Sequence, residues 1–218
     1  MTRRIAGVVF DLDGTLVDSR ADIARAANHA LRRHGCAALS EEQIGTFVGD
    51  GARNLMIRAS GLSGESPLFG ELLRTFLEYY PEHACEQTVL MPGAREALEA
   101  LRELPMAVLT NKPRAATVAV LEGLKISGRF RSVIAGGDLP FLKPEPALLW
   151  ESAKQLGVPV SAIAIVGDGP QDILCGRNAG AFTVGVLGGI ADQQALRDAC
   201  PDRLLASLHQ LADALEAR

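Results

Sequence analysis

The sequence lacks the features that would assign it to several specialised classes of protein. Aromatic residues make up only 5% of its 218 residues, and 22 lysines and arginines face 26 aspartates and glutamates, for a net charge of −4. This shortage of positive charge argues against a nucleic-acid-binding protein. No apolar run approaches the roughly 20 residues of a membrane helix, and the uncharged stretch at residues 179–190 contains four glycines. We therefore expect a cytoplasmic protein that binds neither nucleic acid nor membrane.

The four cysteines carry no metal-binding or redox pattern. Cys36, Cys85, Cys175 and Cys200 form no C-x-x-C pair, and none has a histidine at zinc spacing. A chain of this length can bury a sizeable core and does not need disulfides. We therefore expect free thiols in a reducing compartment.

Short apolar runs alternate with helical patterns along most of the chain. Continuous apolar runs are typical of parallel strands buried on both faces. This alternation predicts an α/β protein with an open, parallel, Rossmann-like sheet and helices on both faces. The expected strands cover residues 7–11, 106–110, 132–135, 162–166, 182–186 and, more weakly, 203–206. The expected helices between and after them cover residues 93–103, 113–124, 146–156, 170–179, 193–199 and 205–216.

One long segment interrupts this alternation, because residues 18–87 contain no convincing strand. Ser40 and Gln43 within it match a capping box at the start of a helix. Further helices are expected over residues 19–33, 51–60 and 67–80.

An all-helical segment of this length predicts a second, smaller domain. We expect a helical cap over residues 18–87, inserted directly after the first strand into an α/β catalytic core formed by residues 1–17 and 88–218. Its hinges are expected near residues 15–19 and 87–92.

The strongest chemical signal is the sequence Asp-Leu-Asp-Gly-Thr at residues 11–15. Asp11 and Asp13 lie two residues apart at the end of a predicted strand, so both side chains can turn to the same side. Gly14 permits a tight turn, and Thr15 supplies a hydroxyl. Two crowded carboxylates repel each other, and Mg²⁺ relieves this repulsion through oxygen ligands. A calcium loop is disfavoured, because the residues at its glycine and bidentate glutamate positions do not match.

A second acidic motif follows another predicted strand. Asp168 can complete a metal site begun by Asp11 and Asp13 if the two strands are neighbours at a switch point of the sheet. Asp172 falls in the first turn of the next helix. The alternative is that Asp168 caps this helix and Asp172 complements its dipole.

Two weaker signals lie between these motifs. Thr110 ends a predicted strand and precedes a helix, so its hydroxyl and the nearby N–H groups can hold an anion; a plain helix cap is the alternative. Lys143 precedes Pro144, which favours an extended backbone. A lone lysine is usually on the surface, so the case for Lys143 depends on the other motifs.

Taken together, these motifs resemble those of the haloacid dehalogenase-like superfamily, whose members use an aspartate nucleophile, and the resemblance covers nearly the whole chain. It implies that Asp11 is the nucleophile and Asp13 the general acid–base. It also implies that Asp11, Asp168 and the backbone carbonyl of Asp13 hold Mg²⁺. Thr110 and Lys143 are then catalytic groups that steady the phosphoryl oxygens.

The same resemblance implies supporting roles for further residues. The phosphate would be bound by Thr110, Asn111, Lys143 and the backbone of Leu12. Thr15 and Asp172 would orient the groups that touch the metal. The helical segment stands where this superfamily carries its helical cap.

Within the superfamily, the chain is most similar to phosphoglycolate phosphatases. The similarity rests on residues 11–19, 48–56, 110–113, 136–138 and 179–180. It implies a small phosphorylated metabolite as substrate, with 2-phosphoglycolate hydrolysed to glycolate and phosphate. The residues expected to select the substrate are Gly49, Asp50, Gly51, Arg53 and Lys112.

Arg53 is the candidate to pair with a substrate carboxylate, because guanidinium binds carboxylates bidentately. The alternative is a solvated helix residue.

Several other functions share part of this pattern. A dehalogenase acts on carbon without a metal, and Asp13 and Asp168 argue against it. A hexose-phosphate mutase, or a phosphatase for another small phosphate or pyrophosphate, fits the same motifs. A non-catalytic phosphate-binding regulatory module would have lost the nucleophile or the lysine, and both are present. The sequence makes no prediction about the oligomeric state.

Overall fold

The six apolar runs form one sheet in the computed structural model, which describes residues 4–216. The strand order is β5-β4-β1-β6-β7-β8, and every neighbouring pair is parallel, which confirms the predicted class of fold. Residues 1–3 and 217–218, at the outer ends of the expected core, lie outside the described residues. The strands are β1 (Gly7–Phe10), β4 (Met106–Pro113), β5 (Ser132–Gly136), β6 (Ile163–Gly167), β7 (Phe182–Val186) and β8 (Arg203–Leu205).

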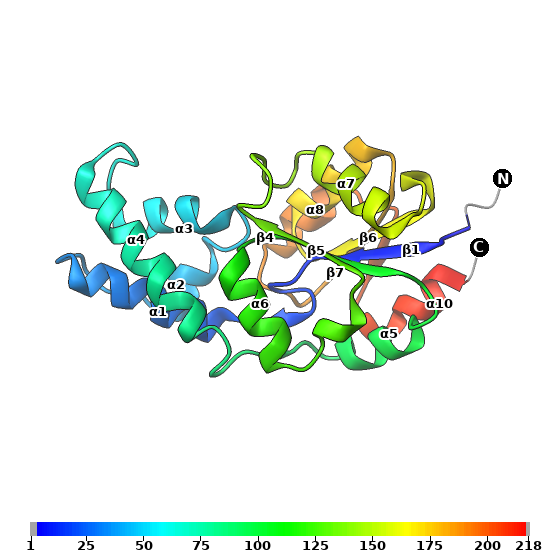
Figure 1. Cartoon of the computed structure of the whole chain (residues 1–218), viewed down its shortest axis with the longest axis horizontal. Helices are drawn as coiled ribbons and strands as arrows, with labels where there is room; N and C mark the ends of the chain where they lie inside the picture. Colours follow the sequence, from blue (N-terminus) through cyan, green and yellow to red (C-terminus); the bar gives the residue numbers. More distant parts are fainter. Residues whose placement is uncertain (1–3, 217–218) are drawn as a thin grey trace.

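Helices cover both faces of this sheet (Figure 1). They are α5 (Ala94–Ala100), α6 (Arg114–Gly123), α7 (Ala147–Leu156), α8 (Pro170–Ala179), α9 (Gln193–Asp198) and α10 (Leu211–Glu216). Three short 3₁₀ helices cover Ser127–Arg129, Val160–Ala162 and Leu208–Gln210.

The central strand, β1, is apolar on both of its faces because helices pack against each of them. Val8 and Phe10 pack in the same cluster as the apolar residues of α5, α6 and α10, whereas Val9 packs in the cluster that contains those of α7 and α8. Successive side chains of a strand point to opposite faces, so a strand between two helical layers is apolar throughout.

Four helices at one end of the sheet account for the long segment without strands. They are α1 (Arg20–Arg33), α2 (Glu41–Gly45), α3 (Gly51–Ser60) and α4 (Pro67–Glu82). We call residues 20–82 the helical lobe; Figure 1 shows it at the far end from the two chain termini. Its predicted capping box is confirmed, because Ser40 Oγ accepts from Gln43 N at 3.1 Å and Gln43 Oε1 accepts from Ser40 N at 2.9 Å.

A short antiparallel ribbon joins the lobe to the sheet. It consists of β2 (Val17–Asp18) and β3 (Val89–Leu90), with Val17 opposite Leu90. The sequence did not predict this ribbon, because two-residue strands are too short to show a period of two.

The C-terminal region differs from the expected helix over residues 205–216. Leu205 belongs to β8, and α10 begins only at Leu211. The other helices begin and end within a few residues of the predicted bounds. Gly157 and Gly180 close α7 and α8 in the left-handed conformation, with φ of 72° and 81°.

The sequence predicted neither a membrane helix nor a disulfide, and the described residues can be checked for both. No helix within residues 4–216 is long and apolar enough to cross a membrane. All four cysteines are described, and all four are free thiols.

Candidate active site

The predicted functional residues gather at the carboxyl ends of three adjacent strands. β1 lies between β4 and β6, and the chain leaves β1 toward β4 and β5 before it returns to β6 on the other side. Ligands of open α/β sheets bind at such a switch point. The end of β1 is fixed to its neighbour, because Asp11 N donates to Val166 O of β6 at 2.9 Å.

Asp11 is buried directly after β1 and lies against a lysine. Its Oδ1 is 2.6 Å from Nζ of Lys143. Burial raises the pKa of Asp11 to about 7, although the positive charge of Lys143 opposes this shift. A carboxylate with few solvent contacts is a better nucleophile than a hydrated one, so the environment suits attack on a bound electrophile.

Lys143 is itself buried and lies between two carboxylates. Its Nζ is 2.6 Å from Asp11 Oδ1 and 2.6 Å from Asp172 Oδ1. Burial acts to lower the pKa of this lysine, but the attraction of the two carboxylates outweighs it and the pKa is raised. Lys143 therefore stays charged across the physiological pH range.

Asp168 follows β6 and is held by a set of hydrogen bonds. Thr15 Oγ1 donates to its Oδ1 at 2.9 Å, and the backbone N–H groups of Ile190 and Ala191 donate to its Oδ2 at 2.8 and 3.0 Å. Burial raises its pKa to about 6. The predicted supporting role of Thr15 has a physical basis here, because its hydroxyl orients this carboxylate.

The backbone packs closely around Asp168. A Cβ atom at Gly14 or at Gly189 would overlap the carboxylate of Asp168. Gly14 also has a φ of +86°, which L side chains rarely adopt. The glycine of the first motif is therefore needed both for the turn and for this close approach.

Three buried carboxylates stand close enough to share one cation. Oxygen atoms of Asp11, Asp168 and Asp172 all lie within 4.8 Å of one another. Lys143 is the ammonium that pairs with two of them, so three negative groups face one positive group. A hard divalent cation fits this oxygen-rich donor set.

The side chain of Asp13 points away from this trio. Its Oδ1 accepts from Ser19 Oγ at 2.6 Å and lies 2.7 Å from Nζ of Lys112. The turn that carries it closes on the carbonyl of Leu12, which accepts from the N–H groups of Leu16 and Val17 at 2.9 and 3.0 Å. Asp11 and Asp13 therefore have different partners, although both line the same pocket.

The end of β4 contributes three consecutive polar residues. Thr110 Oγ1 accepts from Lys112 N at 3.2 Å. The Asn111 amide is largely occupied, because it bonds to both backbone groups of Lys143 and donates to Gly49 O at 2.9 Å. Asn111 therefore joins the sheet edge to the loop of Lys143 and to the helical lobe.

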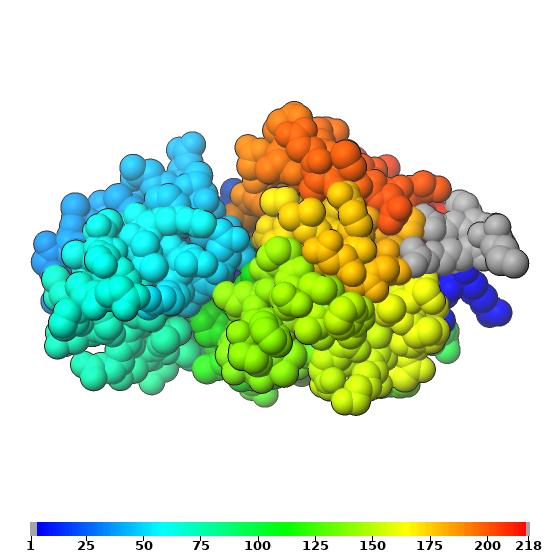
Figure 2. Space-filling view, turned by 90° about the horizontal axis from the view of Figure 1, so that it is seen from above, coloured from blue at the N-terminus to red at the C-terminus, as the bar shows by residue number. Residues whose placement is uncertain are grey.

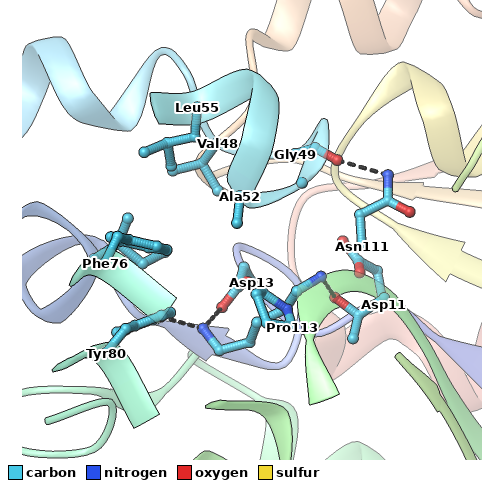
Figure 3. A pocket seen from close by; sticks show the side chains of 14 residues that line it. Asp11, Asp13, Val48, Gly49, Ala52, Leu55, Phe76, Tyr80, Asn111 and Pro113 are labelled. Atoms are coloured by element: carbon cyan, nitrogen blue, oxygen red, sulfur yellow. Dashed lines mark hydrogen bonds and ion pairs between the residues drawn. The ribbon is translucent and has the colours of Figure 1, made fainter. Parts of the chain in front are cut away.

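A pocket opens between the sheet edge and the helical lobe (Figure 3). It has a volume of about 440 Å³, including its opening to solvent. Its floor is polar and its wall on the lobe is largely apolar. It is lined by Asp11, Asp13, Ile23, Val48, Gly49, Gly51, Ala52, Leu55, Phe76, Tyr80, Thr110, Asn111, Lys112 and Pro113.

The expected substrate-selecting residues are only partly brought together. Gly49, Gly51 and Lys112 line the pocket, whereas Asp50 and Arg53 are not among its lining residues. Arg53 is half-exposed, donates to Gly64 O at 3.0 Å and lies 5.2 Å from the centre of the Phe69 ring. Its guanidinium contacts other groups of the lobe. This arrangement agrees with the alternative considered for Arg53, a surface residue of a helix that does not bind substrate. The Asp50 carboxylate pairs with Arg58.

Two residues at the site escaped the sequence reasoning. Ser19 bonds to Asp13, and the hydroxyl of Tyr80 contacts Nζ of Lys112 (Figure 3). Tyr80 looked like one more apolar residue of a helix. Its proximity to the motifs could not be read from a position some 70 residues along the chain from Asp11.

Comparison with known proteins agrees with this geometry. Residues 8–186 match the family of haloacid dehalogenase-like hydrolases. A phosphoglycolate phosphatase of Chromobacterium violaceum is 36% identical over 96% of this chain and 97% of its own. One from Yersinia pestis is 34% identical over 98% of this chain and 94% of its own.

A solved structure is also similar to this chain. The crystal structure of a predicted phosphoglycolate phosphatase from Haemophilus somnus has a TM-score of 0.90 and 31% identity, and covers 98% of this chain and 99% of its own. The chain belongs to the haloacid dehalogenase-like hydrolase family. It is an enzyme of the phosphoric monoester hydrolase class.

Proposed function

We propose that the enzyme is a Mg²⁺-dependent phosphatase that hydrolyses 2-phosphoglycolate to glycolate and phosphate through an aspartyl-phosphate on Asp11. The observation that carries this proposal is the buried carboxylate of Asp11, paired with Lys143 at 2.6 Å and within reach of Asp168 at the end of the central strand. The names of the similar phosphatases supply the choice of substrate.

The donor set supports a magnesium site. Asp11 and Asp168 would hold the ion, together with the backbone carbonyl of Asp13. Asp172 lies 2.6 Å from Lys143 Nζ and accepts from Gly169 N at 3.1 Å, so its role would be to hold Lys143 beside Asp11. When bound, Mg²⁺ would offset the repulsion between the carboxylates and the phosphoryl oxygens.

The first chemical step transfers the phosphoryl group to the enzyme. An oxygen of Asp11 attacks phosphorus, the bond from phosphorus to the ester oxygen breaks, and Asp13 gives a proton to the departing glycolate oxygen. Lys143 and the hydroxyl of Thr110 hold the phosphoryl oxygens during this transfer. The Asn111 side chain would act by fixing the loop of Lys143, since its amide is already bonded to that residue.

The second step returns the enzyme to its starting state. Asp13, now a carboxylate, takes a proton from a water molecule whose oxygen attacks phosphorus, and the bond to Asp11 breaks. Phosphate leaves, Asp11 is again a carboxylate and Asp13 is again protonated. One group thus serves as acid and then as base.

The helical lobe would act as a cap in this cycle. We propose that residues 18–87 form the cap and that residues 1–17 and 88–218 form the core, with the ribbon of β2 and β3 as the hinge. Closure of the lobe would exclude water during the transfer, and opening would admit it for hydrolysis. The free thiols of the four cysteines fit the expected cytoplasmic compartment.

Phosphate release from 2-phosphoglycolate tests the proposal. The protein is stripped with EDTA and assayed with and without added Mg²⁺, beside the variant Asp11→Asn, whose amide cannot act as the nucleophile. We expect activity only for the wild type with Mg²⁺. Full activity in excess EDTA would remove the metal from the mechanism, and wild-type turnover by Asp11→Asn would remove the covalent intermediate. Transfer to a hexose phosphate without release of phosphate would indicate a mutase.

A further inference from the structure

A buried ammonium in the pocket has no role in the chemistry described above. The side chain of Lys112 is 1% exposed, and its Nζ lies 2.7 Å from Asp13 Oδ1. It also contacts the hydroxyl of Tyr80 and lies 4.6 Å from the centre of the Tyr80 ring (Figure 3). An ammonium is costly to bury unless an anion accompanies it. In the described residues, its acidic partner is Asp13, which gives and then takes a proton in the proposed cycle.

The charges around the pocket single out this lysine. Lys112 is the only basic residue among the described residues that line the pocket, and Asp11 and Asp13 are the acidic ones. Lys143 is committed to Asp11 and Asp172 on the floor of the site. The two arginines of α3, Arg53 and Arg58, are engaged by other groups of the lobe. A second anionic group on a substrate would therefore find its counter-charge at Lys112.

We propose that Lys112, with the hydroxyl of Tyr80 beside it, binds the carboxylate of the substrate and so selects short phosphate esters that carry an acid group. This inference rests on the proposed phosphatase function and adds a specificity determinant to it. An ammonium has three N–H donors, and the contacts with Asp13 and Tyr80 use two of them. The third is available to a ligand oxygen.

The position of Lys112 sets the length of the substrate. Asp13 must reach the ester oxygen of the substrate, and Lys112 Nζ touches the same Asp13 carboxylate. The substrate carboxylate must therefore lie within a carbon or two of the ester oxygen, as it does in a phosphorylated 2-hydroxy acid.

The apolar wall of the pocket limits what else can bind. Val48, Leu55 and Phe76 are apolar and line the lobe side of the pocket. Sugar hydroxyls placed against them would lose hydrogen bonds to water without replacement, which costs binding free energy. The pocket therefore favours a small acid over a hexose phosphate.

The test compares two substrates that differ only in the acid group. Wild type and Lys112→Met are assayed on 2-phosphoglycolate and on ethyl phosphate, which has the same number of carbons and no carboxylate. We expect the ratio of kcat/KM for the two substrates to fall about 10- to 100-fold in the variant, as for a lost charge-assisted hydrogen bond. The loss should appear mainly in KM for 2-phosphoglycolate.

A matched control removes a positive charge without touching the pocket. Arg74 is an exposed residue of α4, the helix that carries Tyr80. Arg74→Met should leave the ratio unchanged, which would show that contact rather than overall charge sets the preference. Lys112→Arg keeps the charge and should recover part of the ratio. Tyr80→Phe removes only the hydroxyl and should lower the ratio by about threefold, a fraction of one hydrogen bond; it decides the matter if Lys112→Met does not fold.

The failures of the two proposals are distinguishable. A wild-type protein that hydrolyses neither substrate contradicts the proposed 2-phosphoglycolate phosphatase activity. A wild-type phosphatase whose Lys112→Met and Tyr80→Phe variants lose kcat equally on both substrates contradicts the inference alone, because Lys112 would then only position Asp13. An unchanged ratio in both variants overturns it as well.

Discussion

At the scale of single residues, the site depends on how closely the backbone approaches Asp168. The N–H groups of Ile190 and Ala191 reach its carboxylate only because Gly14 and Gly189 leave room beside it. A motif glycine is thus tied to an acid more than 150 residues away along the chain. This relation belongs to the fold and is invisible in the local sequence.

Gly14→Ala should therefore inactivate the enzyme. The added methyl group would overlap Asp168 Oδ2 and lie 2.8 Å from Ile190 N, and the φ of +86° is unfavourable for alanine. We expect kcat/KM to fall by about 100-fold or more, the size of effect seen when positioning is lost, with a higher Mg²⁺ requirement. Gly188→Ala is the matched control, because its φ is +82° and its methyl would meet no atom within 4 Å. A comparable loss of activity in the control would contradict this account.

Arg53 was predicted to bind the substrate because of its chemistry, but the structure places it outside the pocket. Its guanidinium contacts Gly64 O and the Phe69 ring instead of the pocket. We expect Arg53→Ala to leave the ratio of kcat/KM for 2-phosphoglycolate and ethyl phosphate within about twofold of the wild-type ratio, since surface substitutions have small effects. Steady-state kinetics on both esters measure this. A selective loss on 2-phosphoglycolate would return Arg53 to the site.

At the scale of elements, the two ends of the helical lobe are fastened together by one carboxylate. Asp22, in the first turn of α1, is fully buried. Its Oδ2 accepts from the N–H groups of residues 86, 87 and 88 at 3.0, 2.9 and 2.8 Å, and from the hydroxyl of Thr88 at 2.8 Å. The chain therefore leaves and re-enters the core beside the ribbon of β2 and β3.

Removing this carboxylate should destabilise the protein. Asp22→Ala would leave several backbone donors without their acceptor, and buried unsatisfied groups cost about 1–3 kcal/mol each before water relaxes in. We expect the free energy of unfolding to fall by about 2–4 kcal/mol, measured by urea denaturation. Glu78→Ala, at an exposed position of α4, should change it by less than about 0.5 kcal/mol. Equal stability of Asp22→Ala and wild type would show that this network contributes little.

The elements themselves were largely predictable. Five of the strands were predicted because each contains a continuous apolar run, whereas β8, which begins at Arg203, was predicted more weakly. The helices α3 and α8 were predicted to the residue. The ribbon of β2 and β3 was missed because its strands are two residues long. The helix expected over residues 205–216 was placed too early, since Leu205 pairs with Val186 of β7, residues 208–210 form a 3₁₀ helix and α10 begins at Leu211. No local pattern indicates the pairing of Leu205.

The residues of the candidate site were easier to predict than the contacts between them. Asp11 and Asp168 directly follow β1 and β6, which are neighbours in the sheet, so the topology brings them together. Lys143 comes from the loop between β5 and α7. The contact of Lys112 with Tyr80 depends on how α4 packs over the end of β4, which tertiary packing decides. Asn111 was predicted to bind the phosphate, and the structure adds that its amide joins backbone groups of Lys143 and Gly49.

At the scale of the whole molecule, the buried carboxylates couple stability to pH and to metal. Burial raises the pKa of Asp11 to about 7 and that of Asp168 to about 6, from an ordinary value of 3.8. The folded, metal-free protein thus holds protons between about pH 4 and pH 7 that the unfolded chain releases, so its stability falls as pH rises through that window. The proposed Mg²⁺ would bind the ionised form and should offset the loss.

Thermal unfolding can check this coupling. For metal-free protein, Asp11→Asn should gain in Tm relative to wild type as the pH is raised from about 5.5 to about 8, because the amide carries no charge. Millimolar Mg²⁺ should raise the wild-type Tm more at the higher pH, and should raise that of Asp11→Asn less. A Tm difference between variant and wild type that does not vary with pH would contradict the raised pKa of Asp11.

The loop of Gly49 is one of the places where the lobe meets the sheet edge. Asn111 Nδ2 donates to Gly49 O, and a Cβ at Gly49 would lie 2.7 Å from Gln171 Nε2 of α8. In Figure 2, the cyan part of the lobe rests against the green and yellow segments of the core. Movement of the proposed cap would therefore reach the residues of the pocket through the loop of Gly49.

Gly49→Ala should distort the loop that meets the sheet edge. Its φ of +120° is unfavourable for an L residue, and its methyl group would displace the end of the Gln171 side chain. We expect kcat/KM to fall by about tenfold or more through poorer exclusion of water and poorer positioning. Mg²⁺ binding should stay unchanged, because the proposed ligands all belong to the core. Gly61→Ala is the control, because Gly61 also lies in the lobe with a positive φ of +66°, and its added methyl would meet no atom within 4 Å. The control should lose stability, seen as a lower Tm, and keep its activity at a temperature where it is folded. If both variants lost activity in proportion to their Tm, general destabilisation would explain the result, and contact between lobe and sheet edge would have no part in turnover.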